Sequence, residues 1–96
     1  MAVYAGPMFA CLPNAKWRWR EASHLTADTL AELHAFADRL GLLRRWFQNH
    51  RIMPHYDLSG PMRLRAVRLG AVDQTQRDEL DRLRLARKKE HAHENS

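Results

Sequence analysis

The chain has 96 residues, 45% of them hydrophobic, with a formal net charge of +5 and a pI of about 10.1. This length fits one domain with a modest core, and the hydrophobic content excludes a chain that is disordered throughout. No apolar run approaches the roughly 20 residues of a membrane span. The single cysteine, Cys11, excludes an internal disulfide.

The N-terminal residues and the distribution of charge predict the location of the protein in the cell and the kind of partner it binds. Residues 1–6 have no basic region before an apolar stretch, so we expect no signal peptide and a cytoplasmic protein. Residues 38–68 contain seven arginines against two aspartates, whereas residues 77–96 contain six basic and five acidic residues. An anionic partner would therefore meet the middle of the chain.

The first predicted strand is residues 2–5, a short apolar segment that Gly6 ends. Residues 7–27 are predicted to be irregular, because they contain prolines and an asparagine that favour turns. Within them Trp17 and Trp19 alternate with basic residues, a pattern that also fits an edge strand. The same residues resemble a basic surface on which aromatic rings stack against bases. The alternative is that the tryptophan rings cover the core.

The clearest helix runs from about residue 28 to residue 40. Leucine and alanine recur along it at helical spacing and should face the core. Thr29 and Glu32 have the spacing of a capping box at its start. Gly41 is placed to end the helix in a left-handed turn.

Shorter elements and a last helix follow. Residues 44–48 predict a second strand, and residues 49–57 predict a loop. A second helix begins after Ser59, whose side chain can cap it. Residues 71–72 predict a third strand, after which Thr75 can cap the last helix.

This order of elements, β-α-β-α-β-α, predicts an α/β fold with a small three-stranded, mainly parallel sheet and three helices. We expect residues 1–86 to form a single domain and residues 87–96 to form a mobile charged tail. Association into a homo-oligomer is an option that would enlarge so small a core.

The residues that could carry chemistry gather where the predicted strands end. In an open parallel sheet, ligands bind beyond the carboxyl ends of the strands. The densest group is His55, Tyr56 and Asp57, although neighbours in an extended segment point to opposite sides. The alternative is that these three residues only anchor a loop. His24 and Gln48 are expected at the same edge of the sheet.

Other candidates complete a predicted ligand-binding set. Arg63 can reach back from the second helix to grip a phosphate, and Trp46 or Tyr56 can stack on a base. No metal site and no cofactor are predicted, because His24 and His55 belong to no tight ligand spacing and no second cysteine is present. The full predicted set is His24, Trp46, Gln48, His55, Tyr56, Asp57 and Arg63.

Four short motifs run along the first three quarters of the chain: S-H-[LM]-x-A-D-T, E-L-H-x-[FM]-A, W-[FY]-Q and H-Y-D-[LI]. Together they resemble a family of small bacterial and phage proteins classed as a domain of unknown function, over about residues 2–73. The family's pattern also begins with V-Y-V-D-D-M, and the chain departs from it at Gly6 and Pro7, where that motif has an acidic pair. The resemblance implies no activity, but it implies a set of residues that act together: His24, His34, Trp46, Gln48, His55, Tyr56, Asp57 and Arg63.

Three functions fit these residues. The first is a small-molecule binding protein for an anionic, nucleotide-like ligand; in a phage, such a protein would sequester a host signalling nucleotide. The second is a hydrolase or transferase for a phosphorylated or glycosidic substrate, with His55 as acid or base and Asp57 orienting it. The third, nucleic-acid binding through the basic middle, is less favoured because no recognition motif accompanies the modest charge.

Overall fold

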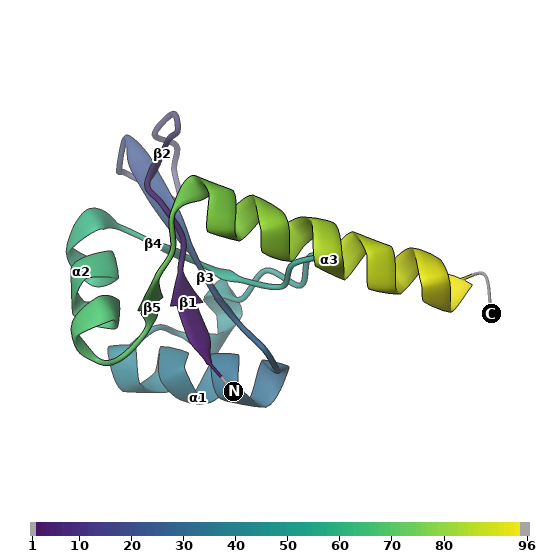
Figure 1. Ribbon diagram of the computed structural model, residues 1–96. Helices are drawn as coiled ribbons and strands as arrows, with labels where there is room; N and C mark the ends of the chain where they lie inside the picture. Colours follow the sequence, from purple (N-terminus) through teal and green to yellow (C-terminus); the bar gives the residue numbers. More distant parts are fainter. Residues whose placement is uncertain (1, 95–96) are drawn as a thin grey trace.

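A curled mixed sheet carries two short helices on one side, and a third, long helix extends away from it (Figure 1). The computed structural model describes residues 2–94, and side chains as far as Lys89. The elements in chain order are β1 (Val3–Ala5), β2 (Phe9–Ala10), β3 (Glu21–Ala27), α1 (Leu30–Leu40), a 3-10 turn η1 (Arg44–Trp46), β4 (Tyr56–Leu58), α2 (Gly60–Arg68), β5 (Val72–Asp73) and α3 (Gln76–Glu94).

Strand β3 is the centre of the sheet. It pairs antiparallel with β1 and β2, and antiparallel with β4 as well. Among the described strands, β1 and β5 form the one parallel pair, with Ala5 opposite Asp73. The predicted parallel relation between the first and last strands is therefore confirmed, but most of the sheet is antiparallel.

The prediction of a three-stranded, mainly parallel sheet is wrong in strand number and direction, although the α/β class and the three helices are confirmed. The predicted second strand is instead the turn η1, where Trp46 is half exposed. The central strand β3 lies in the segment that was predicted to be irregular. Its residues are buried in runs instead of alternating, and Ser23 and Thr26 are buried polar residues that hide the strand pattern.

The helix ends follow the sequence closely. Thr29 is the N-cap of α1, its hydroxyl accepts the backbone N–H of Glu32, and Gly41 ends the helix with a φ of 82°. Ser59 caps α2 in the same way by accepting the N–H of Met62. These predictions are confirmed. The buried residues of α1 and α2 pack on the sheet around a core that includes Leu25, Leu33, Phe36, Leu40, Tyr56, Leu58 and Ala66.

Helix α3 projects away from the sheet (Figure 1), and Arg82 is one of the residues that attach it to the sheet. Arg82 donates to the hydroxyl of Thr26 at 2.6 Å, and its guanidinium lies 3.7 Å from the ring centre of Tyr4. The segment predicted to be a mobile tail, residues 87–96, is helical as far as Glu94, and its last two residues lie outside the described part. No helix among the described residues is long and apolar enough to span a membrane.

Candidate functional site

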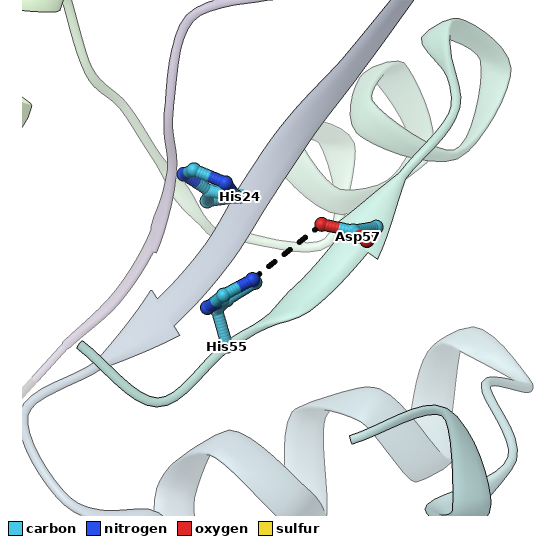
Figure 2. Close-up of side chains that lie close together, drawn as sticks. All are labelled: His24, His55 and Asp57. Atoms are coloured by element: carbon cyan, nitrogen blue, oxygen red, sulfur yellow. Dashed lines mark ion pairs between the residues drawn. The ribbon is translucent and has the colours of Figure 1, made fainter. Parts of the chain in front are cut away.

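Antiparallel pairing of β3 and β4 brings His24, His55 and Asp57 together. His24 lies directly opposite Asp57 in the register, and His55 precedes β4 in an isolated bridge with Gln48. Successive side chains of a strand point to opposite faces, so His55 and Asp57 share a face and Tyr56 points the other way. Figure 2 shows this histidine–aspartate cluster, with the imidazole of His55 and the carboxylate of Asp57 turned toward each other and His24 beside them.

His55 is the most enclosed member of the cluster. Its Nδ1 lies 2.9 Å from the carbonyl oxygen of Met53, and its Nε2 lies 3.6 Å from Oδ1 of Asp57. Burial lowers the pKa of His55 below its ordinary value of 6.5, and the neighbouring His24 lowers it further, against the opposing effect of the Met53 hydrogen bond. Because a carbonyl oxygen can only accept, Nδ1–H donates to Met53, and the lowered pKa favours the neutral ring, whose Nε2 lone pair is free to accept.

His24 is positioned by a residue from α3. Its Nδ1 lies 2.7 Å from Oε1 of Glu79, and its ring centre lies 4.4 Å from that of His55 and 4.8 Å from that of Phe9. Glu79 can approach this closely because Gly6 has no side chain; a Cβ built at Gly6 would overlap the Glu79 carboxylate. The carboxylate of Glu79 therefore lies beside position 6, where this chain has a glycine.

Asp57 is held by Gln48. The side-chain amide of Gln48 donates to Oδ2 of Asp57, and the backbone of Gln48 exchanges two hydrogen bonds with His55, at 2.9 and 3.1 Å. Oδ1, the other carboxylate oxygen, faces His55 (Figure 2). The loop between Gln48 and His55 therefore fixes both the imidazole and the carboxylate.

A pocket of about 710 Å³ opens beside the cluster, between the sheet and α3. Its walls are mostly apolar, with imidazoles at the sheet side and charged groups on the helix side. It falls within the range of volumes of small-molecule sites. The lining residues are Pro7, Met8, Phe9, His24, His50, Met53, His55, Gln76, Glu79, Leu80, Leu83 and Arg87.

Four of the seven residues in the predicted set meet here. His24 and His55 line the pocket, and Asp57 and Gln48 stand next to them. The expected edge of parallel strands is not what assembles them, because β4 runs antiparallel to β3. These four residues therefore lie close together, but through a different strand pairing from the one predicted.

The other three residues of the predicted set lie elsewhere. Tyr56 is 1% exposed on the opposite face, where its hydroxyl lies 2.8 Å from Nδ1 of His34. The guanidinium of Arg63 donates to the backbone carbonyls of Ala5 and Gly6 and to Asp73. Trp46 lies on η1, half exposed. In this structure the polar atoms of Tyr56 and Arg63 bond other parts of the fold, and neither residue lines the pocket.

Glu79 and the α3 wall of the pocket were missed by the sequence analysis. The signal is present in the spacing, because Gln76, Leu80, Leu83 and Arg87 recur every three or four residues and therefore share one face of a helix. From the sequence, these residues were assigned only to a last helix. Its amphipathic character does not reveal that a neighbouring carboxylate reaches His24.

Comparison with known proteins places the chain without giving an activity. The model of one protein family, described as "Protein of unknown function (DUF4031)", matches residues 12–86. No curated protein and no solved structure matches the chain. The match includes every member of the histidine–aspartate cluster, together with Gln48 and Glu79.

Proposed function

The chain belongs to this family of proteins of unknown function, and we propose that it binds a small anionic molecule of nucleotide-like size in the pocket between the sheet and α3. The observation that supports the proposal best is the pocket itself, about 710 Å³ with an apolar wall and a cluster of imidazoles. Pockets of this kind bury an apolar part of a ligand and fix its orientation with a few polar groups.

The polar groups of the pocket suit an anion. His50 supplies a ring N–H on the sheet side, since its Nδ1 accepts the backbone N–H groups of Ile52 and Met53, and Arg87 supplies a guanidinium on the helix side. The carboxylate of Glu79 is engaged by His24, which reduces its repulsion of a negatively charged group. Imidazole and guanidinium N–H groups donate strong hydrogen bonds to phosphate oxygens.

The apolar groups suit a planar ring. Phe9 is 39% exposed and leans against His24, with an angle of 47° between the two rings. Met53, Leu80 and Leu83 add apolar surface to the same pocket. Aromatic rings stack on a nucleobase or a similar ring in offset or tilted arrangements.

A second candidate function uses the same pocket. His55 and Asp57 approach to 3.6 Å at the pocket's edge, which favours a hydrolase or transferase for a phosphorylated or glycosidic substrate. His55 would act as the acid or base, and Asp57 would orient it. Incubation with a panel of nucleotides, followed by chromatography of the products, separates this candidate from simple binding. Any turnover must disappear in His55→Ala.

Isothermal titration of the protein against a panel of nucleotides, in buffer containing a chelator, tests the binding proposal. We expect saturable heat with at least one member, and a loss of affinity of about tenfold or more in His50→Ala and Phe9→Ala. Trp46→Ala is the matched control, because it removes an exposed aromatic ring outside the pocket. Absence of heat and of any thermal shift with every nucleotide would refute the proposal.

The proposal extends to the location of the protein in the cell and to its oligomeric state. Free nucleotides are cytoplasmic, so we place the protein in the cytoplasm; encoded by a phage, it would sequester a host signalling nucleotide. The exposed side chain of Leu85 on α3, which does not line the proposed ligand pocket, supports association of two copies, which light scattering at rising concentration measures. A constant monomer mass would remove the oligomer from the proposal.

A further inference from the structure

We infer that His24, His55 and Asp57 bind one divalent transition-metal ion of the zinc class. One ligand atom from each of these residues lies within 4.8 Å of the other two. No metal site was predicted from the sequence, because His24 lies about thirty residues before His55 and Asp57 and only the antiparallel pairing of β3 and β4 brings it beside them. The site needs no bound small molecule, so this inference stands apart from the proposed function.

Each candidate ligand has its second polar atom held by a different partner. Nδ1 of His55 is fixed by the carbonyl of Met53, and Nδ1 of His24 is fixed by Glu79. Oδ2 of Asp57 is fixed by the side-chain amide of Gln48. Outer partners of this kind set the tautomer and orientation of metal-binding histidines and carboxylates, and carboxylate–histidine pairs are common among them.

The atoms that remain are the ones a metal ion requires. Because Nδ1 of each imidazole contacts an oxygen, Nε2 is the ring nitrogen that remains to bind an ion. Nε2 of His55 faces Oδ1 of Asp57 at 3.6 Å (Figure 2), which is too long for a hydrogen bond. Two ligand atoms that share a zinc-class ion with bonds of about 2.1 Å lie at most about 4.2 Å apart, so a small closure of the cluster completes the geometry.

The donor set selects the class of ion. Two imidazole nitrogens and one carboxylate oxygen suit zinc, cobalt or iron(II), whereas magnesium and calcium prefer oxygen ligands alone. Three protein ligands with further positions open are typical of sites that also bind an exogenous molecule. The side chains of His24 and Asp57 are 30% and 31% exposed, so an ion can enter from solvent.

Titration of chelator-treated, full-length protein with Co²⁺ tests the inference, with the visible absorption spectrum and isothermal titration as the readouts. We expect one ion per chain and a loss of affinity of about tenfold or more in His55→Gln and in Asp57→Asn. The double variant His91→Gln/His93→Gln is the control. It removes two closely spaced histidines that are not among the proposed ligands. Its affinity should equal that of the unchanged protein.

Histidine ring spectra by nitrogen NMR decide the question even where a variant fails to fold. In the unchanged protein, Zn²⁺ must shift the Nε2 resonances of His24 and His55 and leave those of His34 in place. Absence of Co²⁺ binding would overturn the inference, and so would binding that survives in Asp57→Asn but disappears in His91→Gln/His93→Gln. No nucleotide is present in these measurements, so their failure leaves the proposed function untouched.

Discussion

Gly6 and Glu79 compete for one space, because a Cβ at position 6 would overlap the carboxylate of Glu79 that holds His24. Glu79 reaches this position from the first turn of α3, while Gly6 follows β1 directly. The position of His24 thus depends on the absence of a side chain at residue 6.

Gly6→Ala should separate His24 from Glu79 without removing either residue. The carboxylate is the far end of a flexible side chain, so it can move aside and the strand need not. We expect the free energy of unfolding to change by no more than about 1 kcal/mol, since alanine also restricts the unfolded chain. The affinity for Co²⁺ should fall by about tenfold, in the range seen when an outer partner of a metal ligand is lost.

Glu79→Ala provides the comparison for that variant. It removes the same partner of His24 from the helix side, so the two variants should reduce the affinity for Co²⁺ to a similar degree. If the affinity for Co²⁺ is unchanged in Gly6→Ala but falls in Glu79→Ala, the Glu79 carboxylate still contacts His24 when alanine occupies position 6.

Replacement of Arg63 should weaken the fold and leave the pocket intact. Its Nε donates to the carbonyl of Gly6 at 2.6 Å, and its Nη2 donates to that of Ala5 and to the carboxylate of Asp73. Arg63→Met keeps the apolar stem but loses these charge-assisted bonds, so we expect a loss of about 2 kcal/mol in the free energy of unfolding. Urea denaturation followed by circular dichroism measures it.

The control for Arg63→Met is Asp73→Asn, which removes the exposed side of the same ion pair. Asp73 is 65% exposed, so its contribution to stability should be small. A nucleotide affinity that collapses in Arg63→Met, while the protein stays folded, would restore Arg63 to the ligand site predicted from the sequence.

The sequence predicted the helices of this protein better than its sheet, for a physical reason. Helix ends are encoded locally: Thr29 and Ser59 cap helices through bonds that span three residues, and Gly41 takes a left-handed conformation that other residues avoid. Strand pairing is not local. The partner of β3 at β4 is about thirty residues away, and nothing within either segment specifies it.

The site shows the same division. The cluster could be assembled in part from His55 and Asp57, which lie two residues apart, but their neighbour Tyr56 had to point to the other face once the segment became a strand. Glu79 could not be predicted, because its contact with His24 depends on how α3 docks. That docking depends on Arg82, which bonds Thr26 and covers the ring of Tyr4.

Tyr56→Phe should separate the core role of this residue from a ligand role. The ring is 1% exposed, and its hydroxyl lies 2.8 Å from Nδ1 of His34. Phenylalanine fills the same space but leaves the histidine nitrogen without this partner, so we expect a loss of about 1 kcal/mol in the free energy of unfolding. Affinity for nucleotides should be unchanged in isothermal titration. A tenfold loss of affinity in a folded Tyr56→Phe protein would contradict this placement.

The pair formed by Tyr4 and Asp28 should give the protein a stability that depends on pH at both ends of the scale. The Tyr4 hydroxyl donates to Oδ1 of Asp28 at 2.8 Å, and the backbone N–H of Ala2 donates to Oδ2. The hydrogen bond from Tyr4 lowers the pKa of Asp28 below its ordinary 3.8, and the bond to Asp28, with burial, raises the pKa of Tyr4 above 10.0.

The signs of the two shifts define a window. Because the folded state lowers the pKa of Asp28, its contribution is present above about pH 4 and is lost as the pH falls through the lowered value. Because the folded state raises the pKa of Tyr4, its contribution is present below pH 10 and is lost as the pH rises through the raised value. The melting temperature should therefore decline on both sides of this window. Asp28→Asn should flatten both declines, whereas Asp38→Asn, which changes an exposed aspartate on α1, should leave both in place. A profile in Asp28→Asn that still follows that of the unchanged protein would show that other groups control the pH dependence.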